Sequence, residues 1–220
     1  MKIPFIDIHT HHALDSDESI SIRSWFLQDI DRQNNLSIPF SAAIHPWHAT
    51  KFTTEQISEM LLNLIKQPQL IAIGETGLDK SCHVDYQIQK KVFELQIEFA
   101  EDHQKPIIIH AVKSWNDLIV YFKRVNVPVI LHGYSEGIEL TKQLIDLGCY
   151  FSVGKSVLRI TSRFREAIQI IPSTSLFLET DDSNVNISEI YQEVSKIVDI
   201  SLEDLKIQIN ANFKKLFDLC

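Results

Sequence analysis

The sequence predicts an α/β protein built as a distorted (β/α)8 TIM barrel, on three observations. Eight short apolar runs are mostly separated by segments with helical periodicity, as expected for parallel strands joined by right-handed crossovers. Several runs are continuously apolar, which is typical of strands buried on both faces. The glycine-rich phosphate loop of the rival doubly wound sheet is absent from a chain with 6 glycines. We therefore expect one domain over residues 1–220.

The first half of the chain is expected to supply four strands and two helices. The strands are predicted over residues 3–8, 19–25, 40–44 and 70–75. A polar loop over residues 15–18 leaves no room for a helix between the first two strands, so the first crossover helix is reduced to a loop. Apolar residues at helical spacing predict helices over 53–66 and 84–103, the former capped by Thr53 or Thr54.

The second half repeats a strand-and-helix alternation more regularly. Its strands are predicted over residues 106–110, 127–132, 149–153 and 176–181. Its helices are predicted over residues 117–124, 135–147, 163–170, 188–198 and 202–217. Gly148 is placed to end the second of these helices. The alternation predicts that the carboxyl ends of the strands share one rim of the barrel, where barrel enzymes carry their chemistry.

Composition excludes some classes of protein. The net charge of −8 argues against a protein that coats nucleic acid through a basic surface. It does not exclude an enzyme acting on a polyanion, because bound divalent cations reverse the local charge. No apolar run reaches the roughly 18 residues needed to span a bilayer, and the N-terminus has no signal-peptide pattern. We therefore expect no membrane association.

Cysteine usage indicates a reducing compartment. Cys82, Cys149 and Cys220 are odd in number and widely spaced, and none belongs to a CxxC pair. A cytoplasmic, soluble protein is the expectation. We also expect a monomer, since no stretch of the sequence demands an obligate interface.

Six residues of types that can bind metals stand at the predicted strand ends. They are His9, His11, Glu75, His110, His132 and Asp181. His9 and His11 point the same way if they continue the first strand, because residues i and i+2 share a face. Any single member can also be read as a hydrogen-bonded rim residue, but charged groups are rarely buried unpaired. The set as a whole predicts a metal centre.

The number and type of these ligands favour two ions. Six imidazoles and carboxylates exceed the needs of one tetrahedral ion and suit a pair about 3.5–4 Å apart. Glu75 is the best candidate for a bridging ligand, and Asp181 can both bind an ion and accept a proton from water. Mixed nitrogen and oxygen ligands fit Zn, Mn, Fe or Co, with Mg favoured where oxygen dominates. We expect Glu75 and Asp181 to be catalytic.

Ordered motifs along the chain resemble the TatD family of metal-dependent hydrolases. The matching blocks are His9-Thr10-His11, His45-Pro46, Gly74-Glu75-Thr76-Gly77-Leu78-Asp79, residues 106–110, residues 132–135, Leu178-Glu179-Thr180-Asp181 and residues 212–217. The resemblance implies a distorted TIM barrel and metal-dependent hydrolysis, typically of DNA phosphodiester bonds. It also implies the same six residues as metal ligands.

The sequence departs from this family around the expected substrate site. Val112 stands where members usually carry an arginine, and the loop after Asp181 is short and lacks the usual Arg-Asn-Glu-Pro pattern. The resemblance therefore supports hydrolysis more firmly than it supports DNA as the substrate.

Four further residues are candidate substrate contacts. His45 and Trp47 follow a predicted strand and could contact a phosphate or stack on a base, as aromatic side chains do in single-strand binding sites. Lys113 also follows a strand and could bind a phosphate, and Tyr134 is predicted near the rim. Rim packing for the aromatic residues and a solvated state for Lys113 are the alternatives.

Three functions remain open from the sequence. The first is a two-metal phosphodiesterase or deoxyribonuclease acting on DNA ends. The second is an amidohydrolase of small molecules or aminoacyl esters that uses the same metal site. The third is a non-catalytic barrel whose ions are structural, although structural zinc sites normally close with four ligands.

Overall fold

The computed structural model describes residues 3–12, 18–32 and 38–217. Its eight strands form one sheet in which the order β1 to β8 follows the chain, and the pairs β1–β2, β3–β4, β4–β5 and β7–β8 are parallel. The strands are β1 Phe5–Thr10, β2 Ser19–Phe26, β3 Phe40–Ala43, β4 Leu70–Asp79, β5 Ile107–Val112, β6 Val129–Leu131, β7 Tyr150–Val153 and β8 Leu176–Leu178. This is the strand order of a (β/α)8 barrel, as the sequence predicts.

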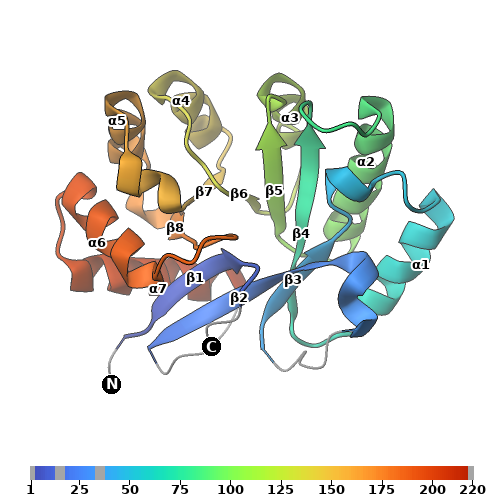
Figure 1. Ribbon diagram of the computed structural model, residues 1–220, viewed down its shortest axis with the longest axis horizontal. Helices are drawn as coiled ribbons and strands as arrows, with labels where there is room; N and C mark the ends of the chain where they lie inside the picture. The colour runs from blue at the N-terminus through green and yellow to red at the C-terminus, as the bar shows by residue number, and fades with distance from the viewer. Residues whose placement is uncertain (1–2, 13–17, 33–37, 218–220) are drawn as a thin grey trace. The chain divides into compact units, whose positions relative to one another are not determined.

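Seven α-helices connect and follow these strands (Figure 1). They are α1 Thr54–Leu64, α2 Tyr86–Asp102, α3 Trp115–Phe122, α4 Ile138–Asp146, α5 Ser162–Ile170, α6 Ile187–Val198 and α7 Leu202–Phe217. Thr53 caps α1, as the sequence predicts, by accepting a hydrogen bond from the backbone N–H of Gln56. Short 3₁₀ helices at Leu27–Arg32, Pro46–His48, Lys155–Arg159 and Ser173–Ser175 are not predicted from the sequence.

Several strand boundaries differ from the prediction near the site. β6 ends at Leu131 and β8 at Leu178, so His132 and Asp181 lie beyond the strands that are predicted to include them. β1 extends to Thr10, so His9 lies within the strand. β4 continues four residues beyond Glu75 to Asp79, although Gly74 and Gly77 argue against strand by propensity alone. Residues 15–17 of the predicted polar loop and Cys220 lie outside the described residues. Cys82 and Cys149 are free thiols.

The chain divides into two compact units, Met1–Arg23 with Leu131–Cys220, and Ser24–Ile130. We call them the terminal unit and the central unit and describe each by itself, and the single-domain assignment stays a prediction. Within residues 3–12, 18–32 and 38–217, none of the helices is both long enough and apolar enough to cross a membrane.

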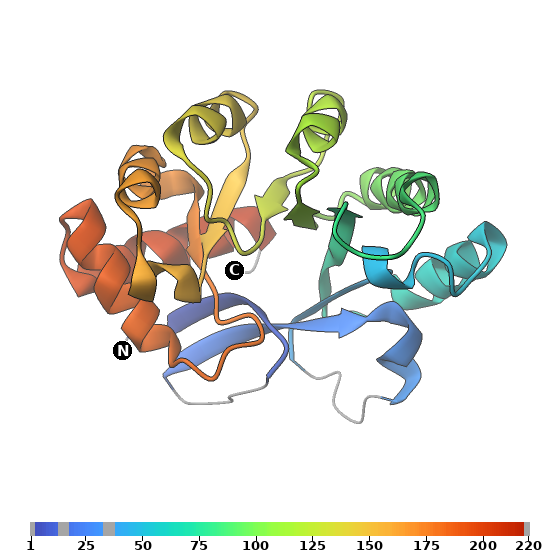
Figure 2. The same cartoon turned by 45° about the horizontal axis from the view of Figure 1, so that its top comes forward.

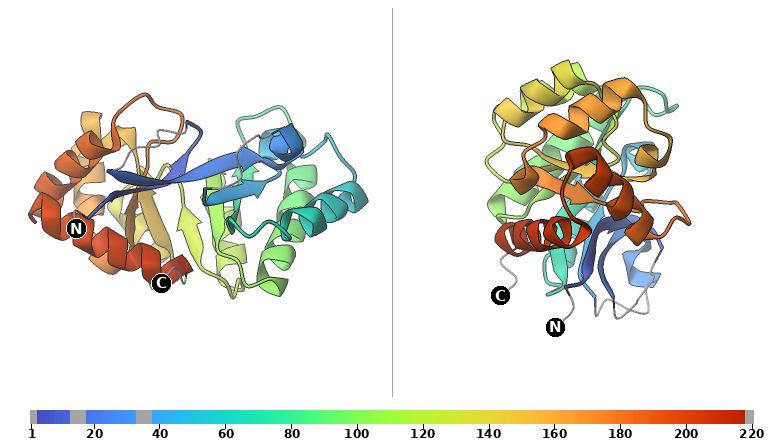
Figure 3. Two further views of the ribbon diagram at one scale, coloured as in Figure 1. Left: turned by 90° about the horizontal axis from the view of Figure 1, so that it is seen from below. Right: turned by 90° about the vertical axis from the view of Figure 1, so that its left-hand side faces the viewer.

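In the terminal unit, helices α4, α5 and α6 follow one another side by side (Figure 2). α6 and α7 pack on β1 (Figure 3). The buried Tyr191 of α6 fixes β1, because its hydroxyl lies 3.0 Å from both the backbone nitrogen and the oxygen of Ile6. Backbone hydrogen bonds of 2.9 Å also join Asp181, just beyond β8, to His9 and His11. β1 and the segment that follows β8 are therefore joined by hydrogen bonds at the candidate ligands.

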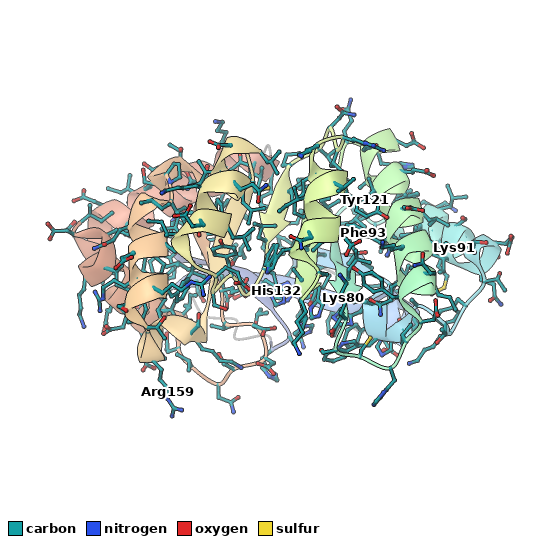
Figure 4. All side chains as sticks on the ribbon, turned by 90° about the horizontal axis from the view of Figure 1, so that it is seen from above. Lys80, Lys91, Phe93, Tyr121, His132 and Arg159 are labelled. Atoms are coloured by element: carbon teal, nitrogen blue, oxygen red, sulfur yellow. The ribbon has the colours of Figure 1, made fainter. Side chains whose placement is uncertain are left out.

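In the central unit, α2 lies along β4 (Figure 1). Two buried glutamines of α2 contact the ends of strands. The Gln96 side chain bonds the backbone N–H and carbonyl of Ile44 and the Thr76 hydroxyl, all at 2.7–3.1 Å. Gln89 likewise pairs with the backbone of Asp79. Phe93 of α2 packs edge-on against Tyr121 of α3, with ring centroids 5.2 Å apart (Figure 4). These bonds fix the segments that carry the central candidate ligands.

Candidate metal centre

The terminal unit brings three predicted ligands together. The Nε2 atoms of His9 and His11 lie 3.7 and 3.8 Å from Oδ1 of Asp181. One ligand atom from each residue falls within 4.8 Å of the other two, a spacing that can hold a metal ion. His9 is fully buried, whereas 24% of the His11 side chain and 28% of the Asp181 side chain are exposed. This group of residues is the terminal cluster.

Asp7 fixes the segment that carries Asp181. Its carboxylate accepts hydrogen bonds from the backbone N–H of Thr180, at 3.0 Å, and from the Thr180 hydroxyl, at 2.6 Å. Burial raises the pKa of Asp7 to about 7, and these hydrogen bonds only partly offset the rise. Asp181 itself adopts a left-handed backbone with φ of 55°, a conformation that non-glycine residues rarely adopt. The bonds from Asp7 help to hold the chain at this unusual residue.

His132 directly follows β6 (Figure 4) and lies against the terminal cluster, its ring centroid 4.3 Å from that of His9. Its Nδ1 atom is 3.0 Å from Oε1 of the fully buried Glu179. A carboxylate there selects the tautomer with a proton on Nδ1 and leaves the Nε2 lone pair for a metal. Burial would raise the pKa of Glu179, but the charge of His132 and its hydrogen bond hold that pKa below its usual value.

The central unit brings Glu75 and His110 together. Nδ1 of His110 lies 2.5 Å from Oε1 of Glu75, and both side chains are buried. Nε2 of His45 is 3.2 Å from the same oxygen, so these three side chains form the central cluster, a second group with metal-binding spacing.

His45 serves the central cluster as a hydrogen-bond donor. The backbone N–H of Trp47 donates to Nδ1 of His45 at 3.2 Å, so this nitrogen carries no proton. A neutral imidazole must then carry its proton on Nε2, the atom facing Glu75. Binding a metal through Nε2 would need an imidazolate. Glu75 and His110 are therefore the ligand candidates of this cluster, and His45 orients Glu75.

Asp79 lies beside the second ring nitrogen of His110, the one that faces away from Glu75. Oδ2 of Asp79 lies 3.4 Å from Nε2 of His110 and accepts a 2.7 Å hydrogen bond from the indole N–H of Trp47. Burial would raise the pKa of Asp79, but hydrogen bonds from Ser81, Trp47 and His110 outweigh it and hold the pKa at about 2. Asp79 therefore lies beside His110 as Glu179 lies beside His132, each a carboxylate next to a ring nitrogen of a candidate ligand.

Two glycines, Gly74 and Gly77, allow β4 to pass very close to β5 on either side of Glu75. Gly77 has φ of 150°, and a Cβ atom there would overlap the backbone carbonyl of His110. A Cβ atom on Gly74 would similarly run into Ile108. Close approach of β4 to β5 at these two positions is what places Glu75 and His110 side by side.

The predicted substrate contacts have different surroundings. Trp47 is half exposed, and Lys113 is exposed with a left-handed φ of 53°. His45 is buried beneath Trp47 and hydrogen-bonds Glu75. Tyr134 is buried at 1% exposure, and its hydroxyl lies 2.7 Å from that of Thr141; its role as a substrate contact stays a prediction. Burial raises the pKa of Tyr134 to about 12.

Sequence reasoning missed three buried carboxylates that support the ligands: Asp7, Asp79 and Glu179. Each lies within two to four residues of a predicted ligand, or pairs with one, inside an otherwise apolar stretch. A charged residue in such a stretch needs a partner, and that requirement is the signal that could have identified them.

Comparisons with known proteins identify the family of this chain. The model of the family described as "TatD related DNase" matches residues 26–218. The chain is 30% identical over 151 residues to the "Uncharacterized metal-dependent hydrolase TatD" of Mycobacterium tuberculosis, covering 64% of this chain and 56% of that relative. It is 32% identical over 145 residues to the human "3'-5' RNA nuclease TATDN2", covering 62% of this chain but 19% of that protein.

A solved structure shares the fold. The Escherichia coli TatD homologue YJJV superposes with a TM-score of 0.85 at 20% identity, covering 100% of both chains. The barrel fold class predicted from the sequence is thereby confirmed.

Proposed function

Because the chain belongs to the TatD-related DNase family, we propose that it is a metal-dependent hydrolase that cleaves phosphodiester bonds at the ends of DNA strands. The observation that carries this proposal is the terminal cluster, where two imidazole nitrogens and a carboxylate oxygen meet within 4.8 Å. The name of the human relative, a 3′–5′ RNA nuclease, also favours a nucleic acid end as the substrate.

The donor atoms fit catalytic divalent ions. Three protein ligands leave coordination positions for water and substrate, whereas structural zinc sites close with four. The supporting carboxylates Glu179 and Asp79 are those that metal-binding histidines normally require. Two ions, one held mainly by the terminal cluster and one by Glu75 and His110, with His132 as a further ligand, are our proposed cofactor set. The bridging role of Glu75 remains part of the proposal.

We assign different roles in hydrolysis to the side chains of the two clusters. When bound, divalent ions lower the pKa of water and neutralise charge on the phosphate. In this proposal the partly exposed Asp181 accepts the proton of an attacking water. His45 donates a hydrogen bond to Glu75 and thereby fixes its carboxylate, while Glu179 fixes the tautomer of His132. Glu75 and Asp181 are the residues on which activity should depend most.

A small-ester or amide hydrolase is the second candidate. Val112, at the end of β5, supplies an apolar side chain where the resembled family usually supplies an arginine for a phosphate. An apolar substrate group would suit this position better than a phosphate. The metal chemistry would be the same in either case.

Hydrolysis of end-labelled DNA tests the proposal. Single-stranded oligonucleotides labelled at the 3′ or 5′ end are incubated with Mg²⁺, Mn²⁺ or Zn²⁺ and the wild type, Glu75→Ala, Asp181→Ala or Glu139→Ala. Glu139 is exposed on α4, so its variant is the matched control. We expect metal-dependent cleavage that falls at least about a hundredfold in the first two variants only. Stoichiometric metal binding without cleavage of DNA would rule out DNA as the substrate and would favour small esters and amides.

A further inference from the structure

Trp47 is an unusual surface residue. Its side chain is 52% exposed, and among the large apolar side chains of the described residues only Leu62, at 54%, is more exposed. It lies in the 3₁₀ helix Pro46–His48, between β3 and α1. Tryptophan is normally well buried, so an exposed indole calls for a reason.

The exposed indole is nevertheless held in one position. Its ring N–H donates a 2.7 Å hydrogen bond to Asp79, which is 2% exposed, and its backbone N–H donates to His45. Its ring packs edge-on against His45, with centroids 4.5 Å apart, and lies 6.0 Å from the ring of His110. A tryptophan that was merely solvated would not be fixed at both its ring and its backbone.

These contacts place the indole directly beside the central cluster. Asp79 bonds both the indole and His110, so the aromatic ring and a candidate ligand share one buried carboxylate. A half-exposed aromatic ring that is fixed before the ligand arrives binds at low entropic cost. The flat apolar ligand that matches such a ring and belongs to a nucleic acid is an unpaired base.

We propose that Trp47 is the stacking platform for a base at the substrate end. This inference rests on the proposed function. Stacking on an aromatic side chain tolerates every base, so we expect the contact to depend on the presence of a base and not on its identity.

The test pairs a change in the enzyme with a change in the substrate. The test compares two single-stranded oligonucleotides. At the labelled end, one has normal nucleotides and the other has abasic tetrahydrofuran sites. For the wild type we expect KM to be about tenfold lower with bases present. Trp47→Ala should reduce this ratio to near one, and Trp47→Phe, which keeps a ring, should retain a ratio of several-fold. Leu62→Ala, which removes exposed apolar surface from α1, should leave the ratio unchanged.

The controls separate stacking from an indirect effect through Asp79. Trp47→Phe and Trp47→Ala both remove the indole N–H, so damage transmitted through Asp79 would lower kcat equally on both substrates in both variants. A base-to-abasic ratio that is the same in the wild type and in Trp47→Ala would overturn the proposal.

Binding of the same two oligonucleotides, followed by fluorescence anisotropy without added metal, gives a second measurement that does not need cleavage. If no DNA is hydrolysed but the base-dependent binding is lost in Trp47→Ala, the stacking role of Trp47 is supported and the proposed hydrolysis of DNA is rejected. Equal binding of both oligonucleotides by the wild type would reject the platform.

Discussion

Nδ1 of His132 and Oε1 of Glu179 lie 3.0 Å apart, and the same oxygen accepts a 2.6 Å hydrogen bond from the backbone N–H of Gly133. The pair joins the residue that follows β6 to the residue that follows β8. Because a carboxylate at this position favours a proton on Nδ1, we expect Glu179 to leave Nε2 of His132 available for a metal.

Replacement of Glu179 by glutamine should weaken metal binding about tenfold. Glutamine keeps the shape and one acceptor but removes the charge that makes His132 a better ligand. Titration with Mn²⁺ or Zn²⁺ against a competing chelator measures the effect. Glu166→Gln, on the exposed face of α5, is the matched control. An affinity within twofold of the wild type would remove Glu179 from the metal centre.

Thr180→Val should destabilise the protein and weaken its metal binding together. The substitution keeps the volume of the side chain but removes the 2.6 Å hydrogen bond to the buried Asp7 carboxylate. Loss of such a bond costs about 1–3 kcal/mol of unfolding free energy. Urea unfolding measures this cost, with Ser58→Ala on the exposed side of α1 as the control. Normal metal affinity in a destabilised Thr180→Val protein would show that this contact does not position Asp181.

Asp117 should make stability depend on acid pH. Hydrogen bonds from Lys80, at 2.7 Å, and Lys90, at 2.8 Å, hold its pKa well below the usual value of about 3.9. The folded state therefore binds fewer protons than the unfolded state, so the contribution is complete above pH 4 and is lost as pH falls toward the depressed pKa. Lys80 is among the residues marked in Figure 4.

Asp117→Asn should consequently lower the unfolding free energy by about 1 kcal/mol at pH 7, with the difference from wild type shrinking between pH 4 and pH 2. Urea unfolding at pH 7, 4, 3 and 2 measures this difference. A gap that stays constant over the whole range would contradict the ion-pair explanation.

Gly77→Ala should be far more damaging than Gly148→Ala. Both glycines have positive φ, but a Cβ atom on Gly77 meets the His110 carbonyl, whereas one on Gly148 meets nothing within 4 Å. We expect about 1 kcal/mol of destabilisation at Gly148, and at least about 3 kcal/mol or failure to fold at Gly77. Circular dichroism and urea unfolding compare the two variants. Equal costs would mean that close approach of β4 to β5 is unimportant.

The candidate ligands can be selected from the sequence, whereas the contacts of the buried carboxylates beside them cannot. His9, Glu75, His110 and Asp181 could be found because each interrupts or ends an apolar run, and parallel strands in a barrel bring such ends to one rim. The structure brings His9, His11 and Asp181 together in one unit and Glu75 and His110 together in the other. The grouping of all six around one pair of ions stays a prediction.

The contacts of Asp79 and Trp47 could not be predicted in this way. They are 32 positions apart, and their hydrogen bond depends on the 3₁₀ helix at Pro46–His48 and on the extension of β4 to Asp79. The 3₁₀ helix has too few residues for a periodic signal. The extension of β4 includes glycine, which disfavours a strand. Tertiary packing decides both.

The central claim is that His9, His11 and Asp181, and Glu75 with His110, hold catalytic divalent ions. Anomalous diffraction from crystals grown with Mn²⁺ tests it most directly. We predict a manganese peak within about 2.0–2.4 Å of ligand atoms of the first three residues and a second peak bound by Glu75 and His110, with His45 hydrogen-bonded to Glu75 and outside the coordination shell. Manganese bound only elsewhere on the protein, with both clusters empty, would contradict the claim.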